Sequence, residues 1–350
     1  MQIVLNVQSL SVFSLVAICT VSVTNLFGEH PTSIAIVGGQ GDAPYAAIVM
    51  SDRSVMELAG LPAEGLTYRV AMNSSGRGIV GGTEGVNAYA ALVSHKGELT
   101  PIGGLRAPGE IYTVAIDESG KGLVGGGHAD SSVPYAALIS SKGEPKSLSL
   151  PPSGLIYRVV LGFFHNGIIG GKGPSNSAYA AFVSRSGMVT PIANLPQGAN
   201  YSVAINNAGV GIMGGTSQSQ PYAAVVSPQG VATPIQNLPT TTGIIYDVAI
   251  NASGTGLIAG LAASHPYGAF IAPNGVLTLL QGLPTGEGFL DGIVLDRSGY
   301  ALVGGESDGA PFLALAAPNG HLTYLNDLPE NGAINSISST KLNQIISMYR

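Results

Sequence analysis

The feature that most constrains this chain is an internal repeat of about 44 residues. A Tyr-Ala-Ala segment recurs along the sequence, and related Tyr-Gly-Ala and Phe-Leu-Ala segments continue the series. The seven copies begin at Tyr45, Tyr89, Tyr135, Tyr179, Tyr222, Tyr267 and Phe312, at intervals of 44, 46, 44, 43, 45 and 45 residues. Repeats of this kind fold as similar small units, which bury their apolar faces against one another.

Two further markers keep the same period. The first is a Val-Ala-Ile motif or its equivalent, which begins at Val70, Val114, Val159, Val203, Val248, Ile293 and Ile337. The second is a pair of small residues, which falls at Gly38-Gly39, Gly81-Gly82, Gly125-Gly126, Gly170-Gly171, Gly214-Gly215, Ala259-Gly260 and Gly304-Gly305. Three markers in one period of 40 to 50 residues are typical of β-propeller blades.

Each repeat contains four short apolar runs, A to D, separated by turn residues. In one copy, run A is 246–250, run B is 256–260, run C is 267–272 and run D is 276–280. Runs of this length are too short for helices and suit strands, and Gly, at 50 of 350 residues, supplies the tight turns. The sequence therefore predicts an all-β, seven-bladed β-propeller of four-stranded antiparallel blades.

The order of the strands follows from proline. Run D contains Pro101, Pro191 and Pro234 in three copies. Because proline cannot donate to a sheet ladder, run D should be the outer edge of each blade, and run A should line the central channel. We expect the ring to close by pairing the last A-like run, 334–339, with the B, C and D runs that begin at Ile34. An eight-bladed ring that also uses the N-terminal stretch is the alternative.

The expected organisation has three parts. Residues 1–27 form a leader, because Ile3–Val23 is apolar and resembles the central region of a secretory signal peptide. No Lys or Arg precedes this stretch, so a degenerate repeat strand is the alternative. Residues 28–340 form the propeller, and residues 341–350 are a tail or an extra strand. A signal peptide would place the protein outside the cell, in a periplasm or on an outer surface. Without one we expect a cytoplasmic protein.

The repeats resemble two known groups. The Gly-Gly ending of run B and the strand order are similar to those of kelch-type propellers, although the chain contains no Trp. The Tyr-Ala-Ala-x-Val-Ser, Leu-Thr-Pro-Ile and Tyr-Ser-Val-Ala-Ile-Asn phrases resemble the repeat-bearing passenger regions of some bacterial autotransporters, over residues 33–340. The second resemblance implies an exported, surface-associated protein that binds or scaffolds.

The sequence predicts no catalytic residues, no metal site and no cofactor. The six histidines show no metal-ligand spacing, and we place His128 and His265 in B–C loops. The string Gly305–Gly309 matches a Gly-x-Ser-x-Gly elbow around Ser307, but that motif needs a strand-to-helix turn, and here it lies between two short strands. We therefore expect a protein that is not an enzyme.

Charge is unevenly placed between the connections. The B–C and D–A connections carry ten acidic and two basic residues, a net charge of −8, and the A–B and C–D turns carry a net charge of +1. The overall net charge of −6 gives no electrostatic case for binding nucleic acid, and we expect no nucleic-acid partner. We expect a monomer with no transmembrane segment beyond the leader. Its partner should be a protein or a glycan, cationic if the acidic connections are the surface it meets.

Two groups of residues are candidate binding residues. The B–C and D–A connections contribute Asp42, Glu84, Glu110, Asp130, Glu306 and Asp308, and the starts of the A runs contribute Arg69, Arg158, Asp247 and Asp291. Variable B–C loops favour a binding or scaffold propeller, and these loops are 40–44, 83–88, 127–134, 172–178 and 216–221. A propeller hydrolase or lyase with its site at the channel mouth is an alternative, and a purely structural repeat array is another. A pocket holding both Arg and Asp would favour the enzyme.

Overall fold

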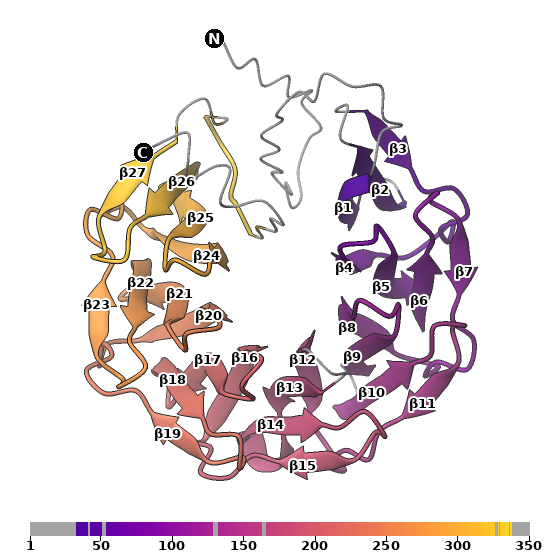
Figure 1. Cartoon of the computed structure of the whole chain (residues 1–350), viewed down its shortest axis with the longest axis horizontal. Helices are drawn as coiled ribbons and strands as arrows, with labels where there is room; N and C mark the ends of the chain where they lie inside the picture. The colour runs from indigo at the N-terminus through magenta and orange to yellow at the C-terminus, as the bar shows by residue number, and fades with distance from the viewer. Residues whose placement is uncertain are drawn as a thin grey trace.

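The computed structural model describes residues 33–40, 43–50, 54–128, 132–162, 166–325, 328, 330–335 and 337. Within these ranges the chain forms seven antiparallel sheets arranged in a ring, as predicted (Figure 1). Six sheets have four strands and the first has three. We number the sheets as blades 1 to 7 in chain order, with β1–β3 as blade 1. The proposed leader and the tail lie outside the described residues.

Blades 2 to 7 have strands at the same four positions, and the described part of blade 1 has the second, third and outermost ones. The innermost are β4 (Thr67–Met72), β8 (Glu110–Ile116), β12 (Leu155–Leu161), β16 (Gly198–Ile205), β20 (Gly243–Ile250) and β24 (Gly288–Leu295). The second are β1 (Ser33–Gln40), β5 (Gly78–Glu84), β9 (Gly122–His128), β13 (Gly167–Lys172), β17 (Gly211–Ser217), β21 (Gly256–Ala262) and β25 (Ala301–Ser307). The third are β2 (Pro44–Met50), β6 (Asn87–Val93), β10 (Val133–Ile139), β14 (Ala178–Val183), β18 (Gln220–Val226), β22 (His265–Ile271) and β26 (Ala310–Ala316). The outermost are β3 (Val55–Glu57), β7 (Leu99–Pro101), β11 (Pro145–Ser147), β15 (Val189–Pro191), β19 (Ala232–Pro234), β23 (Leu277–Leu279) and β27 (Leu322–Tyr324). A short 3₁₀ helix, η2 (Pro174–Asn176), lies between β13 and β14.

The proline argument for strand order is confirmed. Pro101, Pro191 and Pro234 each end an outermost strand, where no further strand needs their missing N–H. The inner strands face the centre of the ring in Figure 1. The residues at the starts of the A runs therefore line the channel, which is where the sequence placed them.

The glycine pair marks the closest approach of adjacent blades. A Cβ on Gly214 would clash with Cγ2 of Ile245, on the inner strand of the next blade. A Cβ on Gly215 would clash with the carbonyl oxygen of Ala199 within its own blade. The first glycine thus admits the neighbouring blade, and the second admits the inner strand of its own sheet.

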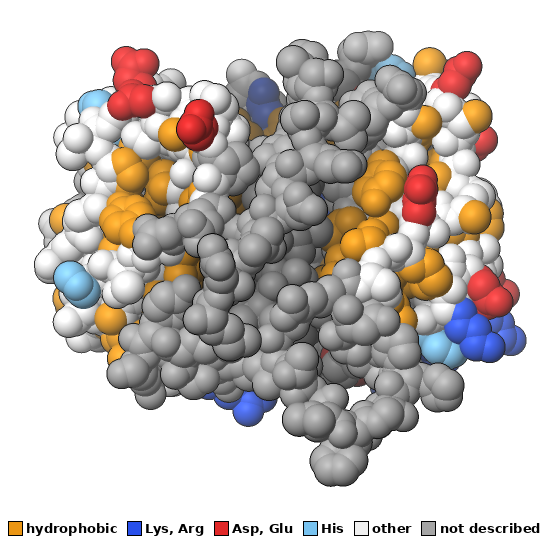
Figure 2. All heavy atoms as spheres, turned by 90° about the horizontal axis from the view of Figure 1, so that it is seen from above, with side chains coloured by type: hydrophobic (Ala, Val, Ile, Leu, Met, Phe, Trp, Pro, Cys, Tyr) orange, Lys and Arg blue, Asp and Glu red, His pale blue; other side chains and the backbone are white. Residues whose placement is uncertain are grey.

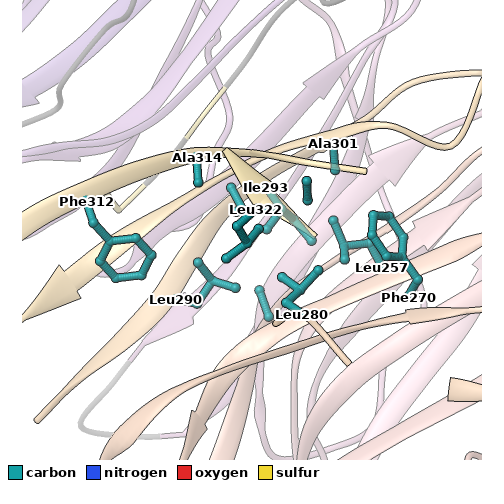
Figure 3. Packing of buried hydrophobic residues seen from close by; sticks show 12 residues of the cluster. Leu257, Phe270, Leu280, Leu290, Ile293, Ala301, Phe312, Ala314 and Leu322 are labelled. Atoms are coloured by element: carbon teal, nitrogen blue, oxygen red, sulfur yellow. The ribbon is translucent and has the colours of Figure 1, made fainter. Parts of the chain in front are cut away.

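The hydrophobic core lies between blades. The cluster in Figure 3 joins Leu257 and Phe270 of blade 6 to Ile293 and Phe312 of blade 7, and its members are buried. Equivalent clusters join the other neighbouring blades. Because each blade buries its apolar side chains against the next, the stability of a blade depends on its neighbours.

The described part of the C-terminal segment occupies the inner-strand position after blade 7. Ile334 is 1% exposed and packs against Leu302, Leu313 and Leu315. Its N–H donates to the carbonyl of Gly305 at 3.2 Å. A Cβ on Gly304 would lie 2.9 Å from Cγ2 of Ile334, the contact that Gly214 makes with Ile245. Hydrogen bonds from this segment to β1 would involve residues outside the described ranges, so closure by strand pairing stays a prediction.

The B–C connections differ in length, as expected, but the extents predicted for several of them are wrong. In blades 2, 5, 6 and 7 the strands continue further than the apolar runs indicated, and two residues join them. These turns are Gly85-Val86, Gln218-Ser219, Ala263-Ser264 and Asp308-Gly309. In the last three both residues have positive φ, which matches the right-handed twist of a hairpin. The reason for the error is that polar residues at strand ends resemble loop residues in sequence. Longer connections remain in blades 1, 3 and 4.

Candidate functional site

The B–C turns and the D–A connections lie on one face of the ring, which we call the upper face. Backbone hydrogen bonds join them directly, for example from Gly85 to Glu64, from Gly243 to Ser219 and from Asp308 to Glu287. The A–B and C–D turns form the opposite, lower face. Figure 2 views the ring from its edge, and acidic side chains stand mainly along one edge while Lys and Arg lie mainly at the other. This distribution agrees with the charge contrast read from the sequence.

The predicted acidic residues of the upper face differ in their surroundings. Glu84 and Asp308 are exposed, whereas Glu110 and Glu306 are half-buried. The Glu110 carboxylate accepts a hydrogen bond from the Tyr68 hydroxyl at 2.8 Å. Asp308 Oδ1 accepts the N–H of Glu287 at 3.0 Å, and Glu306 accepts the N–H of Gly309. Asp42 and Asp130 lie outside the described residues.

Each described inner strand carries a β-bulge at the same position. The register shifts between Thr67 and Arg69 in β4, between Ile156 and Arg158 in β12, and at the matching place in β8, β16, β20 and β24. The extra residue is Tyr68, Tyr112, Tyr157, Tyr201, Tyr246 or, in blade 7, Asp291. Bulges redirect side chains and often border functional sites. Here they set a ring of tyrosines, interrupted by one carboxylate, around the channel.

The residue after the bulge joins one blade to the next. Thr113 Oγ1 accepts the N–H of Val159 at 3.1 Å, and Ser202 Oγ accepts the N–H of Val248 at 3.3 Å. Asp247 takes the same role toward the N–H of Ile293. These bonds satisfy buried backbone groups at the bulge, so the side chains that make them are structural.

Three charged residues meet on the channel wall. Arg158 Nη2 lies 3.4 Å from Asp247 Oδ1. Among the described residues this is the only salt bridge. The same oxygen accepts the Ser202 hydroxyl at 2.8 Å and the N–H of Val248 at 3.0 Å. Burial raises the pKa of Asp247, and Arg158 and these hydrogen bonds oppose the rise. The Asp247 carboxylate is therefore already engaged by Arg158, Ser202 and the backbone N–H of Val248.

Asp291 is the third member of this cluster. Burial raises its pKa to about 7, and the neighbouring Asp247 carboxylate adds to the rise while Arg158 opposes it. Among the described residues its carboxyl makes no hydrogen bond. The folded protein therefore favours the protonated form of Asp291 far more than an exposed carboxyl would.

Asp291 should make the protein less stable as pH rises. Its folded-state pKa, about 7, lies above its ordinary value of 3.8, so the folded form keeps a proton that the unfolded form releases. Stability therefore falls between about pH 4 and pH 7 and levels off above, by up to about 4 kcal/mol. Replacing Asp291→Asn should reduce this loss and raise the melting temperature at pH 8 by a few degrees, and by less than half as much at pH 5, where only part of the loss has occurred.

Thermal unfolding of both proteins at pH 5 and pH 8 checks this expectation. Glu118→Gln, at an exposed lower-face position, is the control and should keep the parent's pH dependence. A parent protein whose stability rises from pH 5 to pH 8, or an Asp291→Asn variant that loses as much stability as the parent, would show that Asp291 is ionised throughout.

Aromatic rings lie on the same inner strands that border the channel. Tyr157 and Tyr201 stack with centroids 5.4 Å apart, Tyr246 packs edge-on against Phe289 at 6.1 Å, and Tyr68 packs edge-on against Tyr112 at 5.6 Å. Such rings attract cations through their faces. The channel mouth therefore combines aromatic surface with carboxylates.

The structure thus brings together three of the four predicted channel residues: Arg158, Asp247 and Asp291. Arg69, in β4, is half-buried and lies apart from them. The sequence analysis did not predict Ser202 as a hydrogen-bond partner of Asp247, nor the β-bulge of the inner strands. A signal exists in the repeat, because a small polar residue, Thr113 or Ser202, stands two positions after a buried Ile or Asn. His128 and His265 end or begin strands rather than lying in loops, and Ser307 ends β25. Within the described ranges no group of three metal-ligating side chains exists, and no helix is long and apolar enough to cross a membrane.

Comparison with known proteins supports the fold. No family model matches this chain, and no curated protein sequence matches it. Among solved structures it is similar to the Dos1 propeller, with a TM-score of 0.64 and 11% identity over 87% of this chain and 85% of that one. A protein from Lactobacillus plantarum matches with a TM-score of 0.57 and 15% identity, over 86% of this chain and 98% of that one. Virginiamycin B lyase from Staphylococcus aureus matches with a TM-score of 0.56 and 13% identity, over 83% and 92%. At these identities the likeness shows a β-propeller fold alone, which hosts enzymes and other proteins alike.

Proposed function

We propose that this protein is a binding propeller that uses its upper face and channel mouth to take a cationic partner, such as a basic segment of another protein. The observation that carries the proposal is the convergence of acidic connections and aromatic rings on one face. Carboxylates attract a cation over distance, and tyrosine rings hold it at contact. By contrast, the positive and negative charges of the lower-face turns nearly cancel.

The positions of the acidic residues support this surface. Glu84 and Asp308 are exposed; Glu84 ends β5 beside a two-residue turn and Asp308 belongs to one, so both project from tight hairpins. Glu110 sits beside the ring of Tyr68, to whose hydroxyl it is bonded. A Lys or Arg side chain entering the channel mouth would thus meet a carboxylate and a ring together. An exported or surface location, as the leader and the repeat resemblance imply, remains part of this proposal.

A catalytic site at the Arg158–Asp247–Asp291 cluster is less well supported than a binding surface. The cluster does hold both Arg and Asp, the combination that would favour a hydrolase or lyase. However, Asp247 already accepts bonds from Arg158, Ser202 and backbone N–H groups, so it is not available as a base. That leaves Asp291 alone, whereas acid–base chemistry on a substrate bond usually needs two groups with separated pKa values. Asp291 therefore contributes negative charge and a proton site to a binding surface.

A charge-matched pair of variants tests the proposal. The upper-face variant carries Glu84→Gln, Glu110→Gln, Glu306→Gln and Asp308→Asn, which keep side-chain size. The lower-face variant carries Glu98→Gln, Glu118→Gln and Glu144→Gln in lower-face turns together with Glu57→Gln in the outer strand β3, all at exposed positions. Both change the net charge equally, so any difference between them reports position. The probe is a fluorescent lysine decamer, with its fully acetylated form as the uncharged control.

We expect the parent protein to bind the lysine decamer and not the acetylated form. Affinity should fall as salt rises, because exposed charges are screened within a Debye length of about 8 Å at 0.15 M. The upper-face variant should lose about tenfold or more, since each exposed charge contributes a few tenths of a kcal/mol. The lower-face variant should change less than about twofold. Equal losses in the two variants, or no binding by the parent, would refute the proposed surface.

A further inference from the structure

One sector of the upper face is almost free of charge. Residues 173–286, which cover the outer strands of blade 4 and all of blades 5 and 6, contain two charged residues in the sequence, Arg185 and Asp247. Arg185 lies in a C–D turn on the lower face, and Asp247 lies in the inner strand β20. The acidic residues of the upper face therefore belong to the remaining blades. The connections here carry hydroxyl and amide side chains instead.

This sector contains a groove of about 600 Å³ between blades 5 and 6. Blade 5 contributes Tyr201, Thr216, Gln218 and Ser219 together with Gln197 before its inner strand, and blade 6 contributes Thr242, Ile244 and Leu261. None of the lining residues carries a charge at neutral pH. The size suits a ligand of small-molecule dimensions, and the lining combines apolar surface with a few polar groups, as binding sites do.

The walls of the groove are held in place by hydrogen bonds that do not use its polar side chains. Gly243 N–H donates to Ser219 O at 2.9 Å, and Ala263 N–H donates to Thr242 O at 2.8 Å. Gln220 Nε2 also donates to Thr240 O at 2.6 Å and so braces the connection into blade 6. The groove is therefore formed before any ligand arrives, which lowers the entropy cost of binding.

The polar side chains that face the groove are uncommitted. Among the residues that the structure describes, the side chains of Gln197, Thr216, Gln218 and Thr242 make no hydrogen bond to the protein. Amides and hydroxyls of this kind both donate and accept. They can therefore pair with a ligand that itself carries hydroxyl groups, without a charge on either side.

Tyr201 supplies an aromatic wall. The stack with Tyr157 of blade 4 fixes the ring on one side, and the blade 6 wall of the groove lies on the other side of β16. A rigid ring beside several amides and hydroxyls suits the C–H face and the hydroxyl edge of a sugar. A charged peptide or an acidic glycan would find no countercharge here.

We propose that the groove between blades 5 and 6 binds an uncharged carbohydrate, stacked on Tyr201 and hydrogen-bonded by the side chains of Gln197, Thr216, Gln218 and Thr242. This site shares the ring of Tyr201 with the channel mouth. The acidic residues of the upper-face variant and the polar side chains of the groove do not overlap, so variants at those residues separate the two sites.

An array of immobilised neutral oligosaccharides, made of hexose, pentose and N-acetylhexosamine units, tests the proposal with the full chain. We expect at least one oligosaccharide to bind, with affinity unchanged between 50 mM and 500 mM NaCl. Tyr201→Ala should lose at least tenfold, and the exposed double variant Gln197→Ala/Thr242→Ala should lose about tenfold without affecting the fold. Tyr112→Ala, at the same bulge in blade 3, is the matched control and should bind as the parent does.

Several results would overturn the carbohydrate assignment. One is an array on which the folded parent binds nothing. Another is a carbohydrate signal that the upper-face acidic variant abolishes and the Gln197→Ala/Thr242→Ala variant preserves. A third is an uncharged Gly/Ser/Gln decapeptide that binds in the groove with the same variant sensitivity while no sugar does, since this would make the ligand a peptide. Binding of the lysine decamer is scored separately, so failure here is distinguishable from failure of the cationic-partner proposal.

Discussion

Replacing Asp247→Ala should lower the free energy of unfolding by about 3 kcal/mol, and the melting temperature by about 4 °C. The change leaves the Arg158 guanidinium without its carboxylate and the N–H of Val248 without one acceptor. It also removes the bond from blade 6 to the N–H of Ile293 in blade 7. Urea unfolding followed by far-UV circular dichroism measures the loss.

A double variant separates the buried charge from the bridge between blades. Arg158→Met combined with Asp247→Leu removes both charges and fills the space with apolar atoms, so it should recover part of the loss. Ser202→Ala should cost less, about 1 kcal/mol, because it removes neutral hydrogen bonds. A loss below about 0.5 kcal/mol in Asp247→Ala would contradict the structural role and would return Asp247 to the candidates for ligand contact.

Replacing Ile334→Ala should destabilise the protein by about 3 kcal/mol. The side chain is 1% exposed and packs in the cluster of Leu302, Leu313 and Leu315, so its truncation leaves a cavity. Because Ile334 stands where an inner strand would stand in the next blade, the loss should also expose the last sheet. Resistance to limited proteolysis should fall together with the unfolding free energy.

Ile245→Ala is the matched control for this effect. Ile245 fills the equivalent space against Gly214, in the middle of the ring, and is fully buried. Similar losses in the two variants would show that the C-terminal segment is as firmly docked as an internal strand. A loss below about 1 kcal/mol for Ile334→Ala alone would mean that the segment frays and contributes little to the ring.

The repeat predicted the blades well because its marker residues are required by the geometry of a blade. The glycine pair leaves room for closely packed neighbouring strands, and the prolines lie on the outer edge strand, where no hydrogen-bonded ladder continues. The period and the strand order could therefore be inferred from the sequence. The charge contrast between the faces also followed, because it depends on connectivity alone. The lengths of the B–C connections did not, since strand-end residues such as Gln220 and His265 are as polar as loop residues.

The candidate site was harder to predict for a geometric reason. A bulge adds one residue to a strand without changing its composition, so Tyr201-Ser202-Val203 reads as ordinary alternation. The bulge decides that Ser202 meets the neighbouring blade, and the pairing of Arg158 with Asp247 spans 89 residues of sequence. Contacts between blades two apart depend on the curvature of the whole ring, which a local pattern does not encode.

The bulge of blade 7 has a consequence for how any partner can sit on this ring. A ring of near-identical sectors offers a ligand at its axis several equivalent settings, related by rotation. Here Asp291 replaces tyrosine at one bulge, and its carboxyl joins Arg158 and Asp247 along one arc of the wall. The charged arc therefore makes the blades non-equivalent around the channel axis. A partner that spans the channel can bind in only one rotational orientation about that axis.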